Sequence, residues 1–338
     1  MKKFLALLMA MMMALSLVAC GGDSGNTSTT GSTGADGEVR VLKLGTTVNE
    51  EDSFHVAATK FAELVEKGTN GAYKIEIYPN ASLGDEPAML ESMQIGTLDA
   101  GIITSGPFVN FAADMGVLDM PFLFSSNEDA YKILDGDIGQ ELLGKLESAN
   151  LKGLAYAERG FRNLTNSVRP VKTAADIAGL KIRVMENEVY TATFKALGVN
   201  AVPMAWSEAL TALQQRTIEG QENPINVLHS YKLWETQKYC TLTRHAYASA
   251  IITMSLDVFN GLPTDVQQVF LDAAQQAAEY ERQWVADNEA TQLQALKDGG
   301  MEVIEDPDIA SFQAAVQSVY DSYPQYADYL NRIKTELG

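Results

Sequence analysis

The longest uninterrupted segment of this chain places the strongest constraint on its fold. Residues Asp265–Asp298 span 34 positions without a proline or a glycine, and Gly299-Gly300 follows them. Thr264 and Gln267 form the pattern of a capping box at the start of the segment. A single helix of this length would measure about 51 Å, whereas a small domain measures about 30 Å across. We therefore expect one helix that lies along more than one domain; the alternative is two helices that break near Ala286–Glu289.

The rest of the chain alternates short apolar runs with helical patterns, which is typical of an α/β protein with mixed or parallel sheets. We expect strands at Val41–Gly45, Tyr73–Tyr78, Leu98–Thr104, Leu151–Ala157, Leu180–Val184 and Ala201–Met204. We expect helices at Phe54–Gly68, Val189–Leu197 and Ser207–Ile218, and a helix start at Gly84-Asp85-Glu86-Pro87.

The beginning of the chain has the composition of an export signal followed by a tether. Two lysines precede Phe4–Ala19, an apolar run of 16 residues, which is shorter than the roughly 20 residues of a membrane-spanning helix. Leu17-Val18-Ala19-Cys20 is similar to the lipobox of bacterial lipoproteins, in which the cysteine is acylated and becomes the mature N-terminus. We therefore expect residues 1–20 to be a lipoprotein signal peptide and Cys20 to carry the lipid. Residues 21–38, rich in Gly, Ser and Thr, are expected to be a flexible tether.

These features predict an extracytoplasmic protein that is anchored to the cell membrane, either in a periplasm or on the outer face of the cytoplasmic membrane. The formal net charge of the chain is −19. Nucleic acid and anionic lipid headgroups would repel such a surface, so we expect contact with the membrane only through the lipid anchor.

Motif content also limits the possible functions. Three histidines are scattered along the chain, and no P-loop, GxGxxG, GxSxG or HExxH motif is present. We therefore expect no cofactor, no bound metal and no enzymatic activity. We interpret Cys240 as a small buried hydrophobic residue.

Arginine is concentrated in one part of this acidic chain. Four of the nine arginines, Arg159, Arg162, Arg169 and Arg183, fall within 25 residues. A guanidinium group presents a planar fork of donors that matches a carboxylate, so this cluster indicates a local site for an anion. Arg183 alternates with two apolar neighbours on an expected strand, and its side chain would therefore face either solvent or a cleft between domains.

A series of motifs has the order and spacing of a known family. The motifs are Leu83-Gly84-Asp85, Gly160-Phe161-Arg162-Asn163-Leu164-Thr165-Asn166, Gly179-Leu180-Lys181-Ile182-Arg183-Val184, Phe194-Lys195-Ala196-Leu197-Gly198, Val202-Pro203-Met204-Ala205-Trp206-Ser207-Glu208, Ala212-Leu213-Gln214-Gln215 and Glu219-Gly220-Gln221-Glu222-Asn223-Pro224. Together they resemble the DctP-type solute-binding proteins of tripartite ATP-independent periplasmic (TRAP) transporters. The resemblance extends over residues 39–338.

The resemblance implies an α/β, two-domain, periplasmic-binding-protein-like (Venus-flytrap) fold. Crossing hinge strands and a long helix that spans both domains would connect the two domains. The expected boundaries are 39–158 and 250–284 for domain I, and 159–249 and 285–338 for domain II. Such a protein would act as a monomer that captures a small organic acid and delivers it to the small and large subunits of a TRAP membrane permease.

The resemblance also implies which residues bind the ligand. Arg183 would form a two-pronged salt bridge with the ligand carboxylate, Arg162 and Asn223 would orient the same carboxylate, and Trp206 would form a wall of the pocket. The other expected ligand-binding residues are Thr47, Glu86, Thr104, Ser105, Glu186 and Asn187.

Three functions remain open at this point. The first is a TRAP receptor for a sugar acid such as a hexuronate, or for a C4 dicarboxylate, with sugar acids favoured by the polar residues near Arg183. The second is the binding protein of an ABC importer. The third is a surface-anchored hydrolase, for which Glu219 and Glu222 would be the candidate carboxylates. We interpret those two residues as solvated carboxylates in a turn.

Overall fold

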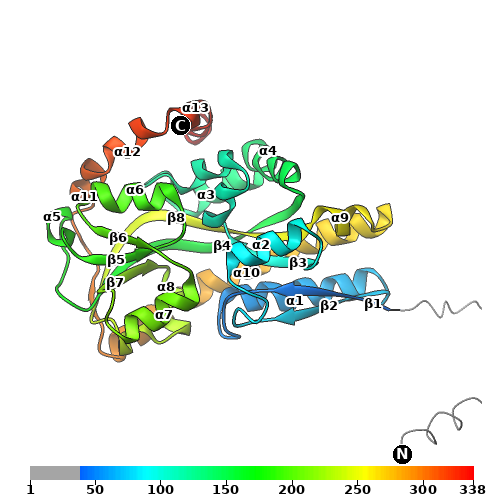
Figure 1. Cartoon of the computed structure of the whole chain (residues 1–338), viewed down its shortest axis with the longest axis horizontal. Helices are drawn as coiled ribbons and strands as arrows, with labels where there is room; N and C mark the ends of the chain where they lie inside the picture. The colour runs from blue at the N-terminus through cyan, green and yellow to red at the C-terminus, as the bar shows by residue number, and fades with distance from the viewer. Residues whose placement is uncertain (1–38) are drawn as a thin grey trace, which may run out of the picture. The chain divides into compact units, whose positions relative to one another are not determined.

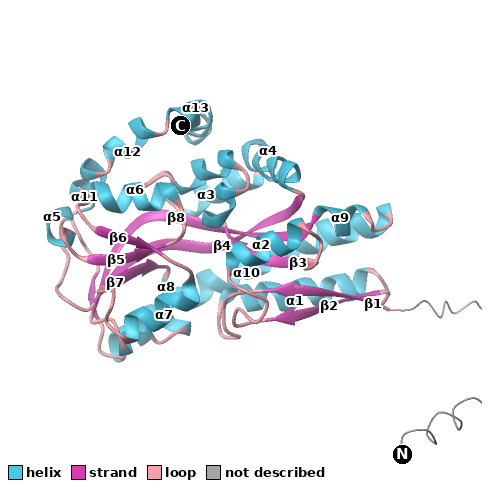
Figure 2. Cartoon of the chain, viewed as in Figure 1, coloured by secondary structure: helices cyan, strands magenta, loops and turns pink. Residues whose placement is uncertain are grey.

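A single mixed sheet of nine strands organises the computed structural model, which describes residues 39–338 (Figure 1, Figure 2). The order of hydrogen-bonded neighbours is β2-β1-β3-β8-β4-β7-β5-β6, and β9 pairs with β8. The strands are β1 (Arg40–Gly45), β2 (Tyr73–Tyr78), β3 (Ala100–Thr104), β4 (Leu151–Asn166), β5 (Lys181–Val184), β6 (Asn200–Pro203), β7 (Gly220–Asn223), β8 (Tyr239–Ser255) and β9 (Glu302–Ile304). The predicted α/β class with a mixed sheet is confirmed.

Two long strands, β4 and β8, connect two groups of shorter strands. They run antiparallel to each other from Leu151 opposite Ser255 to Asn166 opposite Tyr239. At the first of these ends, β8 pairs with β3, which leads to β1 and β2; we call β1 to β3 the first strand group. At the other end, β4 pairs with β7 and β8 pairs with β9; we call β5, β6, β7 and β9 the second strand group. These two strands are the expected crossing strands of a two-domain fold.

Strand β4 is irregular in the middle, between the two strand groups. Its register with β8 shifts between Glu158 and Gly160 and again between Arg162 and Leu164. Gly160 has a φ of 102°, a left-handed conformation that glycine adopts without steric cost. Such bulges bend and twist a strand, so they locate the bend of β4 where it leaves one group and enters the other.

Helices lie on both sides of this sheet (Figure 2). They are α1 (Ser53–Gly68), α2 (Glu86–Gln94), α3 (Asn127–Asp135), α4 (Asp137–Lys145), α5 (Ala174–Ile177), α6 (Glu188–Ala196), α7 (Trp206–Gln214), α8 (Ile225–Ser230), α9 (Leu256–Asn260), α10 (Thr264–Asp298), α11 (Ile309–Ala315), α12 (Gln317–Ser322) and α13 (Ala327–Leu337). The short 3-10 helices are η1 (Gly106–Asn110), η2 (Ala113–Asp119), η3 (Leu146–Ala149), η4 (Leu233–Glu235) and η5 (Pro324–Tyr326).

Helix α10 is continuous over 35 residues, which corresponds to about 52 Å. It packs against α1, against β4 and against α8, so it touches elements that flank both strand groups. Alanines at 273, 274, 277 and 278 are fully or almost fully buried on its first half, where small side chains allow a close approach to α1. The prediction of one long helix is confirmed, and the alternative of a break near Ala286–Glu289 is wrong.

The predicted capping box at the start of this helix is wrong. Helix α10 begins at Thr264 after Pro263, and no side chain caps it. The Gln267 amide instead donates to the carbonyl oxygens of Phe259 and Leu262, each at 3.1 Å. Gln267 therefore fixes the preceding turn rather than completing a capping box.

The buried apolar side chains form three clusters. One lies between the first strand group, α1 and the first half of α10, and includes Phe61 and Phe270. Another surrounds α7 and α8 and includes Leu296 at the far end of α10. The largest combines α2, α3 and α4 with α6 and the C-terminal helices. Because α10 contributes to two of these clusters, it ties the two ends of the sheet together.

Two further observations concern the membrane and the start of the chain. In residues 39–338, no helix has both the length and the apolar character needed to cross a bilayer. The expected signal peptide (1–20), the tether (21–38) and Cys20 lie outside the residues that the structure describes.

Candidate ligand-binding site

Arg183 occupies the third position of β5, and its guanidinium group lies beside the first turn of α7. Its Nε and Nη2 donate to the carbonyl oxygen of Met204 at 2.9 and 2.8 Å. The guanidinium carbon lies 5.5 Å from the centre of the Trp206 ring, within the range of a cation–π contact. These contacts hold the group in one orientation and use two of its five N–H donors.

The charge of Arg183 is buried without a balancing carboxylate. The side chain is only 4% exposed, and within residues 39–338 no carboxylate oxygen lies within ion-pair distance of it. Burial lowers the pKa of Arg183 to about 10, although the charge of Glu222 acts in the opposite direction. The group therefore stays protonated at neutral pH, and an anion that reached it would relieve the cost of burying an unpaired charge.

The other three arginines of the predicted cluster already have partners. Arg159 donates to Asp52 at 2.6 Å, and Arg162 forms a buried ion pair with Glu222. Arg169 donates to two backbone carbonyl oxygens, at 2.7 Å each, near the end of α5. The clustering in sequence therefore does not correspond to one basic patch. Of the four arginines, Arg169 and Arg183 bond to carbonyl oxygens rather than to a carboxylate, and of these two only Arg183 is buried.

A narrow pocket surrounds Arg183 and collects half of the expected ligand-binding residues. Its empty volume is about 250 Å³. Its lining residues are Thr47, Asp85, Glu86, Pro87, Pro107, Arg183, Met185, Glu186, Ala205 and Trp206. They come from the ends of β1 and β5 and from the starts of η1, α2 and α7, so both strand groups contribute to the pocket. Five of the ten expected residues are among them: Thr47, Glu86, Arg183, Glu186 and Trp206.

Hydrogen bonds hold the acidic side of this pocket in position. One oxygen of Glu86 accepts from the backbone N–H and from the hydroxyl of Thr104, both at 2.8 Å. The carboxylate of Asp85 accepts from the hydroxyl of Ser207 at 2.7 Å. Thr104 is therefore placed behind Glu86, where it fixes the carboxylate.

The remaining expected residues bond to other protein groups and do not line the pocket. Ser105 donates to Asp119 at 3.3 Å, and Asn223 donates to Gln221 at 2.6 Å. Asn187 donates to Asp119 as well. Neither these residues nor Arg162 line the pocket.

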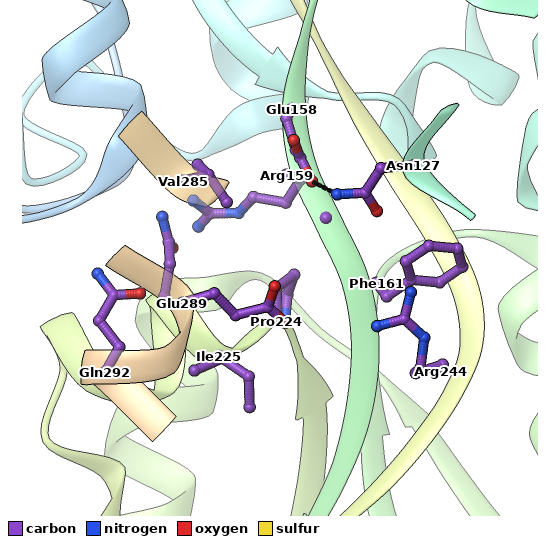
Figure 3. Close-up of a pocket in the computed structure, with 12 residues that line it drawn as sticks. Asn127, Glu158, Arg159, Phe161, Pro224, Ile225, Arg244, Val285, Glu289 and Gln292 are labelled. Carbon is purple, nitrogen blue, oxygen red and sulfur yellow. Dashed lines mark hydrogen bonds between the residues drawn. The ribbon is translucent and has the colours of Figure 1, made fainter. Parts of the chain in front are cut away.

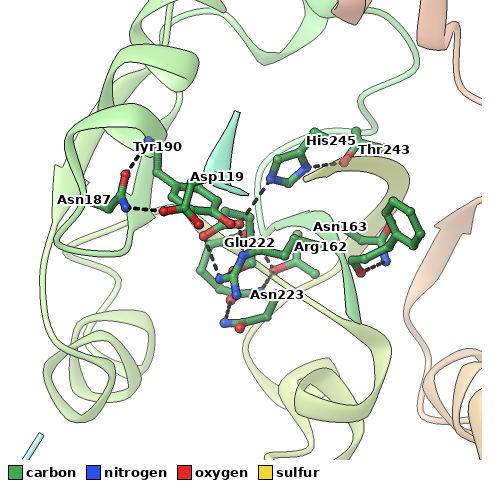
Figure 4. A network of polar contacts seen from close by, with 12 residues as sticks. Asp119, Arg162, Asn163, Asn187, Tyr190, Glu222, Asn223, Thr243 and His245 are labelled. Atoms are coloured by element: carbon green, nitrogen blue, oxygen red, sulfur yellow. Dashed lines mark hydrogen bonds and ion pairs between the residues drawn. The ribbon is translucent and has the colours of Figure 1, made fainter. Parts of the chain in front are cut away.

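A buried polar network joins β4, β7 and β8 (Figure 4). Arg162 bonds to both carboxylate oxygens and the carbonyl oxygen of Glu222, His245 lies 3.2 Å from the same carboxylate, and Thr243 lies 2.8 Å from the other ring nitrogen of His245. Burial alone would raise the pKa of Glu222, but Arg162 and His245 lower it to about 2. Glu222 is therefore ionised and neutralises Arg162.

This network corrects one interpretation of the sequence and reveals residues that the sequence did not indicate. Glu222 is fully buried in an ion pair, so its assignment as a solvated turn carboxylate is wrong. His245 and Asp119 were not among the expected site residues. The one local signal for Asp119 is that a charged residue stands within an apolar run, Met115–Met120, which marks a buried carboxyl group.

A second pocket lies beside the bulge of β4, where β4, α8 and α10 meet (Figure 3). Its empty volume is about 330 Å³. None of the ten expected ligand-binding residues lines it, and its buried arginine, Arg159, is paired with Asp52. Burial raises the pKa of Glu158 to about 7 in this region. Arg244 also lines this pocket, but it is exposed and its guanidinium carbon lies 3.9 Å from the centre of the Phe161 ring, while Glu158 and Glu289 bring two carboxyl groups to the same lining. With its buried arginine already paired and two carboxyl groups in its wall, this pocket is a weaker candidate for an anionic ligand.

Comparison with known proteins identifies the family. The sequence model of the family described as bacterial extracellular solute-binding protein, family 7 (DctP), matches residues 44–326. The 2,3-diketo-L-gulonate-binding periplasmic protein YiaO of Escherichia coli (strain K12) is 40% identical over 297 residues, which cover 86% of this chain and 90% of that protein.

Solved structures agree with this assignment. A TRAP periplasmic solute-binding protein from Polaromonas sp. JS666, bound to D-erythronate, superposes with a TM-score of 0.86 at 42% identity and covers 87% of this chain and 98% of its own. The sugar acid binding protein DctPAm from Advenella mimigardefordensis strain DPN7T, in complex with galactonate, gives a TM-score of 0.86 at 31% identity, with 89% and 100% covered. The chain belongs to family 7 of the bacterial extracellular solute-binding proteins, and its class is that of a solute-binding receptor outside the cytoplasm. The expected family and two-domain fold class are confirmed.

Proposed function

We propose that this protein captures a sugar acid through Arg183 and delivers it to the membrane permease of a TRAP transporter. The observation that carries this proposal is the buried guanidinium of Arg183, which has no carboxylate partner among residues 39–338 and lines a pocket between the two strand groups. A ligand carboxylate would accept from its free N–H groups in a two-pronged salt bridge. Trp206 would wall the pocket beside this salt bridge.

The other charges of the pocket favour a ligand with a single carboxylate and several hydroxyl groups. Asp85, Glu86 and Glu186 line the same pocket as the one arginine. Ligand hydroxyls can donate hydrogen bonds to these carboxylates, whereas the carboxylates would repel a second carboxylate on the ligand. Two carboxylates about 5 Å apart repel by about 3 kcal/mol at an effective dielectric constant near 20. The pocket therefore favours an aldonate or a hexuronate over a C4 dicarboxylate, in line with the sugar acids bound in the two solved relatives.

The same comparison distinguishes the remaining functions. The solved relative from Polaromonas sp. JS666 is described as a TRAP periplasmic solute-binding protein, which favours a TRAP permease over an ABC importer as the partner. A glycosidase would need a pair of catalytic carboxylates, but Glu222 is ionised in a buried pair with Arg162 and Glu219 accepts from the backbone N–H of Lys181. Neither group is placed to act on a bond in the Arg183 pocket.

Ligand entry requires the two sides of the pocket to separate. The room that the pocket leaves for the centre of a water-sized sphere is about 20 Å³, far below the roughly 300–1,000 Å³ of typical small-molecule sites. We propose that domain I (39–158 and 250–284) and domain II (159–249 and 285–338) move apart about the middle of β4 and β8. The ligand then favours the closed form because it binds groups from both sides only in that form.

We further propose the setting in which the receptor works. It acts as a monomer, contacts the small and large permease subunits when closed, and is held at the membrane by a lipid on Cys20. The resemblance of Leu17-Val18-Ala19-Cys20 to a lipobox and the Gly/Ser/Thr-rich residues 21–38 support the anchor.

Thermal stabilisation tests the ligand class directly. The melting temperature of the purified protein is measured with D-erythronate, D-galactonate, D-glucuronate, 2,3-diketo-L-gulonate and succinate, and with galactonamide as an uncharged control. A ligand at 100 times its Kd stabilises the native state by about 2.7 kcal/mol, so a true ligand gives a clear increase.

We expect an increase with at least one sugar acid and none with the amide, and the acid is recovered unchanged after incubation. Equal stabilisation by galactonate and galactonamide would contradict the role of Arg183. A stronger effect of succinate would favour a dicarboxylate receptor instead.

A further inference from the structure

The side-chain amide of Asn187 uses its full hydrogen-bonding capacity within the protein. Its oxygen accepts from the backbone N–H groups of Val189 and Tyr190, at 2.8 and 3.0 Å, and so caps the N-terminus of α6. Its nitrogen donates to the carbonyl oxygen of Gly106 and to a carboxylate oxygen of Asp119, both at 2.8 Å. An amide has two N–H donors and two lone pairs on its oxygen, so these four bonds leave nothing for a ligand.

These bonds join two segments that lie on opposite sides of the pocket. Asn187 follows β5 and belongs to the proposed domain II, whereas Gly106 begins η1 and Asp119 ends η2 in the proposed domain I. Asn187 and Asp119 are 3% and 1% exposed, so water does not compete for the contact. Figure 4 shows the nitrogen of the Asn187 amide directed toward Asp119, while the oxygen of the same amide faces the backbone nitrogen of Tyr190 in the helix that it caps.

The contact lies immediately behind the ligand pocket. Pro107 and Glu186, which line the pocket, are the chain neighbours of Gly106 and Asn187. The backbone of Gly106 lies close to the side chain of Met185, another lining residue. A Cβ atom added at Gly106 would lie only 2.8 Å from the Cε atom of Met185. Asn110 adds a parallel bond, from its side-chain nitrogen to the carbonyl oxygen of Glu186 at 3.1 Å. Forming these bonds therefore brings the two walls of the pocket together.

We propose that Asn187 is a positioning residue that holds the pocket closed by bonding to Gly106 and Asp119, and that it does not touch the ligand. The inference rests on the proposed function, in which a sugar acid binds between two domains that open and close. It replaces the ligand contact that the resemblance implied for Asn187. Opening the pocket would break both bonds from the amide nitrogen and leave the helix cap intact, since the cap lies within one segment.

The substitution Asn187→Asp removes the closing contact but keeps the helix cap. Aspartate caps helices as well as asparagine does, so α6 keeps its N-terminal hydrogen bonds. The variant loses both N–H donors and brings a second carboxyl group toward Asp119. The double substitution Asn187→Asp with Asp119→Asn restores a donor and an acceptor between the two positions, with the roles reversed. Asn200→Asp serves as a control, because Asn200 is an exposed asparagine that bonds to the carbonyl oxygen of Gly179 outside the pocket.

Two measurements test the proposal. Small-angle X-ray scattering gives the radius of gyration of each protein without ligand and with D-galactonate or D-erythronate. Stopped-flow fluorescence gives the dissociation rate constant of the same acids. For Asn187→Asp we expect a larger radius without ligand and dissociation about tenfold faster, because closure loses two buried hydrogen bonds. The double variant should recover part of both changes, and Asn200→Asp should behave as the wild type.

The outcomes separate this proposal from the alternatives. The proposal would be wrong if Asn187→Asp and the wild type had the same radius of gyration without ligand, even if the variant bound the ligand more weakly. A residue that contacts the ligand directly would give that combination of results. A double variant no better than Asn187→Asp would also overturn the proposal. If no sugar acid binds the wild-type protein, the proposed function fails, but the comparison of ligand-free radii still decides the role of Asn187.

Discussion

At the scale of single residues, the role of each arginine depends on its partner rather than on its position in the sequence. Arg159 and Arg162 face the carboxylates of Asp52 and Glu222, which satisfy their charge inside the protein. Arg183 bonds only to the neutral carbonyl of Met204 and so retains a full charge that an anion can neutralise. Burial increases the strength of that interaction, because the lower dielectric constant of the interior screens it less than water does.

The first prediction concerns the geometry of this group. Arg183→Lys keeps the positive charge but replaces the planar fork with a point charge, so the two-pronged bond to a carboxylate is lost. We expect the affinity for the identified sugar acid to fall by at least about tenfold, which corresponds to about 1.4 kcal/mol. Isothermal titration calorimetry measures this change.

Arg332→Lys is the matched control, since Arg332 forms a surface ion pair with Glu141 on α4, outside the pocket. Its affinity should equal that of the wild type. Equal affinities for Arg183→Lys and the wild type would exclude a two-pronged bond.

At the scale of elements, the packing of α10 on β4 buries two carboxyl groups side by side. Glu281 is fully buried, and one of its oxygens accepts from the backbone N–H of Glu158 at 2.9 Å. Burial and the nearby charge of Glu158 raise the pKa of Glu281 well above its usual range. Burial also raises the pKa of Glu158, from 4.5 to about 7. We therefore expect Glu281 to hold its proton at neutral pH in the folded protein.

The second prediction follows from this proton. A carboxyl group with a higher pKa in the folded state stabilises the fold fully below its unfolded pKa and loses that contribution as the pH rises. The free energy of unfolding should therefore decrease between about pH 4.5 and pH 7 as Glu158 loses its proton, and Glu281 extends this decrease to higher pH. Glu281→Gln, whose amide is neutral at every pH, should be more stable than the wild type at pH 8 by at least about 1 kcal/mol.

Urea unfolding at pH 5 and pH 8 measures both effects. The difference between Glu281→Gln and the wild type should be small at pH 5, where the wild-type carboxyl holds its proton. Glu279→Gln, an exposed position on the same helix, is the control and should change little at either pH. A variant that is less stable than the wild type at pH 8 would show that Glu281 is ionised in the folded state.

At the scale of the whole molecule, charge and membrane attachment are connected. The net charge of −19 makes an anionic lipid surface repel the protein, so electrostatic attraction cannot keep it at a membrane. The described helices offer no membrane span either. We predict that retention at the membrane depends on the proposed lipid at Cys20.

The third prediction tests that anchor. In cells that express the chain, Cys20→Ser should move the protein from the membrane fraction to the soluble fraction, while the wild type should stay in the membrane fraction even at about 1 M salt, where electrostatic attraction is screened. Immunoblots of the separated fractions measure the distribution. Cys240→Ser is the control, since Cys240 is a free, buried residue whose thiol pKa burial raises to about 12. Membrane retention of Cys20→Ser would contradict lipid attachment at this residue.

Local patterns predicted some elements well and others poorly. Helix α10 and strands β1 and β2 were predicted close to their observed bounds, because an absence of glycine and proline and an apolar alternation are local signals. The second half of β4 was missed, since it carries Arg162, Asn163, Thr165 and Asn166, which are polar and yet buried. Strand β8 was missed as well, because most of its residues are buried on both faces and show no alternation.

The predictions for the ligand site also depended partly on local sequence and partly on contacts between distant residues. The residue types and motif order were sufficient to predict the family and the α/β class, since these depend on local sequence, and the family resemblance was the basis for proposing Arg183 as the group that binds a carboxylate. Only the tertiary structure decided that Arg162 is neutralised by Glu222 and that Asn187 bonds across the pocket to Asp119. Those partners are 60 and 68 positions apart in the chain, and no local pattern specifies which of many acidic groups folding brings within hydrogen-bonding distance.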